Sequence, residues 1–182
     1  MARDGKSVLL IDSDLRRPRI HENFEIDNDQ GLTNVLFEHA KFDEVVYKEN
    51  AIPGLSVLTS GILPPSPDEL LGSEKYWSFI EWAKGRFDII LLDAPPVLIV
   101  SDAAILSQKV DGVVLVVAAH HTKKQAVINA VGSLDKVGAN ILGVAINKMN
   151  FGKTHRYYGE YYNTYDTKDK KKGKLFGAVS KR

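Results

Sequence analysis

The sequence predicts an α/β fold built on an open, mostly parallel sheet with helices on both faces. Short apolar stretches of strand length alternate along the chain with longer amphipathic stretches of helix length, and this alternation is typical of parallel sheets with crossover helices. The strand-length stretches are almost continuously apolar, as expected for strands that are buried on both faces. With 182 residues, of which 44% are hydrophobic, the chain is long enough to form one domain with a substantial core.

The expected elements follow one another in a regular order. Apolar stretches predict strands at residues 8–11, 55–58, 87–92, 113–117 and 141–146. Amphipathic stretches predict helices at residues 31–37, 73–85, 101–106 and 123–137, and residues 21–30 are expected to form a loop. A further helix is expected to begin near Ser66, because Ser66-Pro67-Asp68-Glu69 has the capping-box pattern with proline at the first helical position. In the last helix, the expected inward side chains are those of Val127, Val131 and Leu134.

Two carboxylates and two guanidinium groups directly follow the first predicted strand. Asp12 and Asp14 come at its carboxyl end, which is where ligands gather in parallel sheets. Alternate carboxylates suit Mg2+ and its waters, and Arg16 and Arg17 suit phosphate oxygens. The structural alternative is an aspartate that caps a helix, with solvated arginines.

A second apolar strand also ends in a carboxylate, that of Asp93. Aspartates that end neighbouring parallel strands are the means by which phosphate-binding sheets hold a metal ion and its water. Each of the two strand ends therefore strengthens the prediction made from the other.

The segment Gly5-Lys6-Ser7 imitates the end of a P-loop but does not fit that motif. The first glycine of the motif would fall before Met1, and the strand at residues 8–11 follows where a helix should begin. We interpret Gly5 as a turn residue.

Composition and charge exclude several classes of protein. The chain contains no cysteine, which excludes disulfides and thiolate metal sites, and no apolar run approaches the roughly 18 residues that a membrane span requires. From Lys168 onward, seven Lys or Arg residues face one Asp, so this tail carries +6 and the remaining chain −5. Such a tail could contact anionic lipid or nucleic acid, but a solvated end is the preferred interpretation.

Four segments together resemble the bacterial tyrosine kinases that control capsular and exopolysaccharide export. Asp12-x-Asp14-x-Arg16-x-Pro18 is similar to the Walker A′ motif of that family, and Ile90 to Pro96 to its Walker B motif. Residues 59–71 resemble its Gly-x-x-Pro-Pro-x-Pro-x-Glu-Leu-Leu segment. The tyrosine cluster resembles its C-terminal autophosphorylation tail and comprises Tyr157, Tyr158, Tyr161, Tyr162 and Tyr165. The resemblance covers nearly all of the chain.

The resemblance implies a P-loop NTPase of the deviant-Walker, partitioning-ATPase type, with ATP and Mg2+ as cofactors. It implies transfer of the γ-phosphoryl group to tyrosines on the tails of neighbouring copies. Asp12 is then the candidate for coordinating a Mg2+ water and drawing the tyrosine proton, Asp14 for supporting the metal shell, and Asp93 for the Walker B water. Arg16 is expected to contact phosphate or an adjacent subunit, and Asn147 the nucleotide base. An Asn147 that merely turns the chain is an equal alternative.

The resemblance also implies partners and a location. A membrane adaptor, or polysaccharide co-polymerase, and further copies of the chain are the expected partners, nucleic acid is not, and the location is the cytoplasmic side of the membrane. We expect a kinase or ATPase domain at residues 1–150 and a flexible tail at residues 151–182. The alternatives are a non-catalytic interaction module that a complete kinase phosphorylates, a partner-binding helix face formed by the tyrosines, and a partitioning-type ATPase.

In the family, the P-loop strand and its helix precede the first residue of this sequence. We therefore expect the 182-residue chain by itself to bind ATP·Mg weakly or not at all. We also expect the Asp93 strand to lack a neighbour on one side, so that the isolated chain is marginally stable and prone to oligomerise.

Overall fold

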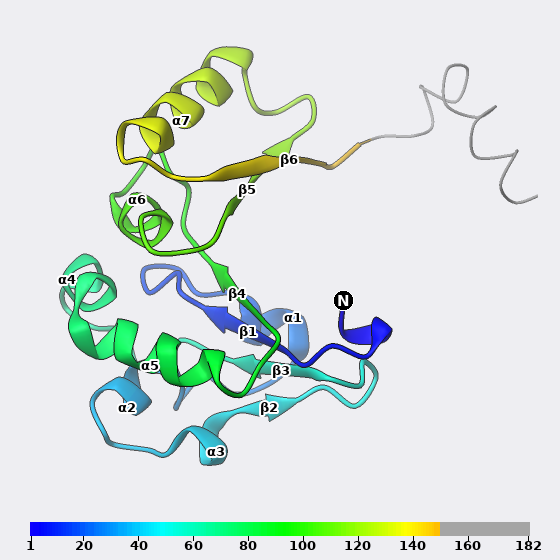
Figure 1. Ribbon diagram of the computed structural model, residues 1–182, viewed down its shortest axis with the longest axis vertical. Helices are drawn as coiled ribbons and strands as arrows, with labels where there is room; N and C mark the ends of the chain where they lie inside the picture. Colours follow the sequence, from blue (N-terminus) through cyan, green and yellow to red (C-terminus); the bar gives the residue numbers. More distant parts are fainter. Residues whose placement is uncertain (150–182) are drawn as a thin grey trace, which may run out of the picture. The chain divides into compact units, whose positions relative to one another are not determined.

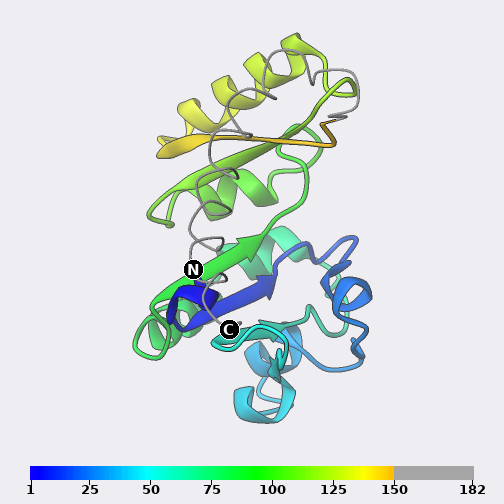
Figure 2. The same cartoon turned by 90° about the vertical axis from the view of Figure 1, so that its right-hand side faces the viewer.

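Four strands form the first sheet and confirm the predicted α/β class. The computed structural model describes residues 1–149 of the chain. The sheet has the order β2-β3-β1-β4, where β1 is Val8–Asp12, β2 is Tyr47–Lys48, β3 is Leu55–Leu58 and β4 is Ile89–Asp93. β1 runs parallel to both β3 and β4, whereas β2 pairs antiparallel with β3, so the sheet is mixed and mostly parallel. In Figure 2 the blue arrow of β1 and the green arrow of β4 point the same way.

A second, two-stranded sheet joins β5, Val113–Ala118, to β6, Ile141–Asn147. The amide of Val113 donates to the carbonyl of Asn140, and six residues later that of Ala119 donates to the carbonyl of Asn147. The two partners advance in the same direction along both strands, so the pair is parallel.

Helices lie in every connection between consecutive strands except the one between β2 and β3 (Figure 1). After the short 3-10 helix Ala2–Asp4 come seven α-helices: α1 Ile20–Phe24, α2 Leu32–Leu36, α3 Phe42–Val45, α4 Pro67–Gly72, α5 Glu74–Lys84, α6 Asp102–Ser107 and α7 Lys124–Lys136. None of the helices in residues 1–149 is long and apolar enough to span a membrane.

The described chain divides into two compact units. The first contains residues 1–115 and 123–144, and the described part of the second contains residues 116–122 and 145–149. Asp12, Asp14, Arg16 and Asp93 all belong to the first unit, whereas Asn147 belongs to the second. The expected domain boundary near residue 150 falls at the end of the described residues and stays a prediction.

The main hydrophobic core lies between the first sheet and several helices. Leu9, Ile11 and Leu58 contribute side chains from the strands, and α5 contributes one of its faces, with Tyr76, Phe79, Ile80 and Ala83. The side chains of Leu9, Ile11 and Leu58 are fully buried. This packing places the carboxyl ends of β1 and β3 at one edge of a well-anchored sheet.

Three local predictions were wrong in part. Residues 20–24 form α1 instead of a loop, because backbone amides at the start of that helix find a partner in the Asp12 carboxylate. The Ser66 side chain makes no capping hydrogen bond, although Pro67 does begin α4 as predicted. Val131 is 37% exposed on α7 rather than inward, whereas Leu134 is buried.

One edge of β4 and one face of the second sheet are exposed. Among the described residues, β4 pairs only with β1, as expected for a strand that lacks one neighbour. The large apolar side chains that are exposed on β5 and β6 occupy alternate positions, which marks one face of this sheet. They are Val114, Val116, Leu142, Val144 and Ile146. Continuously apolar strands thus leave a large apolar face without a cover in the described chain.

Candidate active site

The site lies where β1 and β4 end side by side. Asp12 and Asp93 are register partners in the parallel pair, and the amide of Ser13 donates to the carbonyl of Asp93 at 2.9 Å. The structure therefore brings the two strand-terminal aspartates together, as their positions in the sequence predicted. Asp14 follows two residues after Asp12 and completes the group of three carboxylates.

Asp12 is fully buried and is held by the backbone. Its Oδ2 atom accepts hydrogen bonds from the amides of Arg19, at 3.1 Å, and Ile20, at 3.0 Å. Its Oδ1 atom accepts only a longer bond, from the amide of Asp14 at 3.3 Å. Oδ2 thus caps α1, which is the helix-capping role considered as the structural alternative for this residue. Oδ1 is held less firmly.

Asp14 organises the turn that follows. Its Oδ1 atom accepts hydrogen bonds from the amides of Arg16, at 3.2 Å, and Arg17, at 2.9 Å. These bonds leave Oδ2 without a partner among the described residues, in a side chain that is only partly buried. Asp93 is exposed, so the two aspartates best placed to meet a solvated ion are Asp14 and Asp93.

The three carboxylates repel one another. Although the Asp93 side chain is exposed overall, neighbouring atoms at the strand end remove part of the water around its carboxylate, and this desolvation raises its pKa. The negative charges of Asp12 and Asp14 raise the pKa of Asp93 further. Burial also raises the pKa of Asp12, against the lowering effect of its three backbone hydrogen bonds. Within residues 1–149, none of the three forms an ion pair, so a bound cation would relieve this repulsion.

The donor set fits Mg2+ held largely through water. In the described part of the chain, no three His, Asp or Glu side chains lie close enough together to hold a metal ion by themselves. Mg2+ usually keeps several waters and takes one or two carboxylates together with substrate phosphates. The site thus suits a hydrated Mg2+ rather than a fully protein-coordinated metal.

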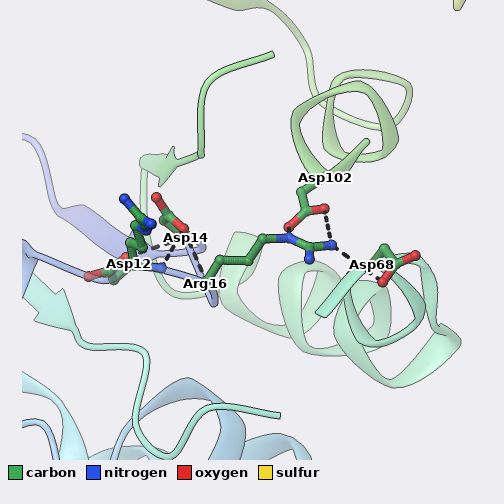
Figure 3. Close-up of polar contacts among 6 residues, drawn as sticks. Asp12, Asp14, Arg16, Asp68 and Asp102 are labelled. Atoms are coloured by element: carbon green, nitrogen blue, oxygen red, sulfur yellow. Dashed lines mark hydrogen bonds and ion pairs between the residues drawn. The ribbon is translucent and has the colours of Figure 1, made fainter. Parts of the chain in front are cut away.

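Arg16 points away from the carboxylates toward two helices (Figure 3). Its Nε and Nη2 atoms donate to the two oxygens of Asp102 on α6, at 2.8 and 2.9 Å. Asp68 on α4 lies 3.5 Å from Nη2. Sequence reasoning treated Asp102 only as part of a helix start, and no sequence signal marks it as the partner of Arg16.

Ser13 and Tyr76 form a further contact that sequence reasoning missed. The two hydroxyl groups are 3.0 Å apart, and both residues are fully buried. Burial raises the pKa of Tyr76 far above its ordinary value, so the phenol stays protonated. α5 is thereby tied to the residue between Asp12 and Asp14.

The segment that resembles the Pro-Pro motif leaves the same edge of the sheet, because β3 runs parallel to β1. The amide of Gly61 donates to Asn28 Oδ1 at 3.0 Å, and the Cβ of any other residue at position 61 would lie 2.4 Å from Asn34 Oδ1. Beyond this anchored base, Ile62 and Leu63 are 65% and 51% exposed.

The remaining candidate residues are placed as follows. Gly5 adopts a left-handed conformation after the 3-10 helix, and Ser7 bonds to Asp88 before β1 begins, which confirms that Gly5-Lys6-Ser7 is a turn and not a P-loop. Asn147 ends β6, where its Oδ1 atom accepts the amide of Lys148 at 2.7 Å. The five clustered tyrosines lie outside the described residues.

The chain is similar to several curated kinases. It is 40% identical over 165 residues to tyrosine-protein kinase YwqD of Bacillus subtilis, covering 91% of this chain and 68% of that kinase. It is 36% identical over 160 residues to putative tyrosine-protein kinase CapB of Staphylococcus aureus, covering 88% of this chain and 70% of CapB. No protein-family model matches the chain.

Solved structures that superpose well on this chain include proteins of related sequence. The crystal structure of the chimerical protein CapA2B2 superposes with a TM-score of 0.78 at 32% identity, over 81% of this chain and 65% of that chain. The septum site-determining protein MinD of Pyrococcus horikoshii, with 22% identity and a TM-score of 0.64 over 84% of this chain and 62% of that chain, shares the fold. Its likeness carries no information about activity.

Proposed function

The chain belongs to the bacterial tyrosine kinases, and from this premise we propose that it acts in transfer of the ATP γ-phosphoryl group to tyrosine hydroxyls. The process it serves is the regulation of capsular or exopolysaccharide synthesis and export. The observation that carries the proposal is the convergence of Asp12, Asp14 and Asp93 at the shared edge of two parallel strands. Such a cluster of unpaired carboxylates suits a metal ion that accompanies phosphate groups.

We assign different tasks to the three carboxylates. Asp14 is partly buried and Asp93 is exposed, and they would orient the waters of Mg2+. Asp12 would act through Oδ1, the more weakly held of its oxygens, to order a metal water and draw the proton of the tyrosine. When bound, ATP would supply the transferred group, and Mg2+ would offset part of the negative charge of its phosphates.

The phosphate acceptors that we propose are Tyr157, Tyr158, Tyr161, Tyr162 and Tyr165. Five tyrosines within nine residues, among glycine, asparagine, threonine and glutamate, give an acceptor segment with little apolar content of its own. We further propose that copies phosphorylate one another, and that a membrane adaptor recruits the chain to the cytoplasmic face of the membrane. Nucleic acid has no part in this proposal.

Phosphorylation of the purified 182-residue chain at high concentrations of ATP and Mg2+ tests the proposal. We expect phosphate on the tyrosine cluster by mass spectrometry, and at least a tenfold loss in Asp93→Asn, because one or more orders of magnitude are typical when a charge-stabilising group is removed. Asp135→Asn, which changes an exposed aspartate on α7, is the matched control and should leave the rate unchanged.

Two results would count against catalysis by this chain. If Asp93→Asn and the control behave alike, the carboxylate cluster is not the catalytic site. If the chain forms no phosphotyrosine alone but is phosphorylated by an added complete kinase such as YwqD, the non-catalytic interaction module is the better description.

A further inference from the structure

We infer that Asp102 is a positioning residue: from α6, this buried carboxylate holds Arg16 and thereby fixes the Asp14 carboxylate of the metal site. The inference rests on the proposed function for the role of Asp14, and on the geometry alone for the role of Asp102. Figure 3 shows the three residues, with Arg16 reaching from the loop after β1 to the first turn of α6.

The Arg16–Asp102 contact is the most strongly built ion pair in the described chain. The Asp102 side chain is 0% exposed, and its two oxygens accept separate hydrogen bonds from Nε and Nη2 of Arg16. Such a two-bond fork fixes direction as well as distance, and lysine cannot reproduce it. The other ion pairs in residues 1–149 join two partners that are both at least about one-third exposed.

The constraint on the Arg16 side chain passes directly to Asp14. The backbone amide of the same Arg16 donates to Asp14 Oδ1 at 3.2 Å, and the next amide, that of Arg17, donates to the same atom at 2.9 Å. A residue whose side chain is locked to α6 therefore holds the hydrogen bonds that orient the Asp14 carboxylate. Displacing the Arg16 side chain would loosen both of these bonds.

The charges around Arg16 argue against its use as a phosphate ligand. Asp102 and Asp68 together bring two negative charges to one guanidinium group, and only the Asp102 contact is buried. The net charge of this trio is −1, which would repel a phosphate rather than attract it. Arg16 is therefore better described as a tether between the loop and α6 than as the contact to phosphate that the sequence predicted as one of its two roles.

Asp102→Asn tests the inference, with Asp68→Asn as the matched control that removes the longer, exposed contact to the same guanidinium. In the full chain, we expect the amides of Arg16 and Arg17 to exchange with solvent about tenfold faster in Asp102→Asn, as for loss of a charge-assisted hydrogen bond. We expect the Mg2+ concentration for half-maximal phosphorylation to rise severalfold, with a smaller change in the rate at saturating Mg2+. Asp68→Asn should change neither quantity by more than about twofold.

The experiment distinguishes a failure of the proposed kinase function from a failure of the positioning role of Asp102. If wild-type chain shows no Mg2+-dependent phosphorylation, the proposed function fails, while amide exchange still decides the positioning role. Should Asp102→Asn not fold, Arg16→Lys keeps the charge beside Asp102 but removes the fork, and the same accelerated exchange is expected. Two results would overturn the inference. One is unchanged amide exchange at Arg16 and Arg17 in a folded variant. The other is a phosphorylation rate that is reduced by the same factor at low and at saturating Mg2+.

Discussion

The hydroxyl pair of Ser13 and Tyr76 allows a sharp prediction about stability. Both residues are fully buried, their oxygens are 3.0 Å apart, and the hydroxyl of Tyr76 has no other hydrogen-bond partner in the described chain. Changing either residue alone leaves the other hydroxyl without water and without a partner. We expect Tyr76→Phe and Ser13→Ala each to lower the free energy of unfolding by about 1–3 kcal/mol, which is the usual penalty for a stranded buried group.

The double variant should cost less than the sum of the two single changes. When both hydroxyls are removed, no buried polar group is left unpaired, and the remaining loss is that of one net hydrogen bond, about 1 kcal/mol. Subtracting this loss from the sum of the two single losses gives an expected coupling free energy of about 1–5 kcal/mol between two residues that are 63 positions apart in the chain.

Urea unfolding of the 182-residue chain and its three variants, followed by tryptophan fluorescence, measures these differences. The slope of the free energy with urea must stay constant across the set for the comparison to hold. Strictly additive losses would show that the two hydroxyls do not interact. Losses below about 0.5 kcal/mol in both single variants, the level of ordinary surface changes, would show that the site is not sealed from water.

Three further predictions follow from the same structure. The pKa of Asp93 in the folded chain is raised above the ordinary 3.8, so ionisation of Asp93 destabilises the fold as pH rises above that value. The variant Asp93→Asn should therefore have a higher melting temperature than wild type at pH 7 and the same melting temperature at or below pH 3.8. A lower melting temperature of the variant at pH 7 would contradict this prediction. Gly31→Ala should lower the free energy of unfolding by about 1–3 kcal/mol, because the added Cβ would lie 2.3 Å from the carbonyl oxygen of Thr59. Gly132→Ala in α7 should raise that free energy by about 0.5–1 kcal/mol, because its Cβ meets no atom within 4 Å. Equal effects of the two variants in urea unfolding would refute the packing argument. One edge of β4 and one face of β5 and β6 are exposed in the described chain, so we expect the protein to self-associate and to melt below about 60 °C. A monomer that melts cooperatively above that temperature would show that these apolar surfaces are covered.

Much of the fold could be predicted because strand and helix periodicity are properties of neighbouring residues. The strands that begin at Val8, Leu55, Ile89, Val113 and Ile141 all start within about two residues of their expected positions. The short elements α1 and β2 were missed because they depend on contacts between residues that are not neighbours in the sequence. α1 depends on a carboxylate eight residues before Ile20, and β2, with only two residues, depends on pairing with β3.

The sequence by itself determined which carboxylates end the strands. The alternation of apolar and polar residues sets where a chain leaves a sheet, so Asp12 and Asp93 had to lie at strand ends and, in neighbouring parallel strands, near each other. The assignment to the tyrosine kinases likewise required only the order of residues, since identity to relatives is a property of the sequence.

Only the tertiary structure decided what the polar side chains contact. Arg16 and Asp102 are 86 residues apart, and Ser13 and Tyr76 are 63 apart, so no local pattern pairs them. The partner of a long side chain depends on which helices pack beside its loop and on which carboxylates they bury. For this reason Arg16, which resembles a phosphate ligand in the sequence, becomes in the folded chain a tether to α6.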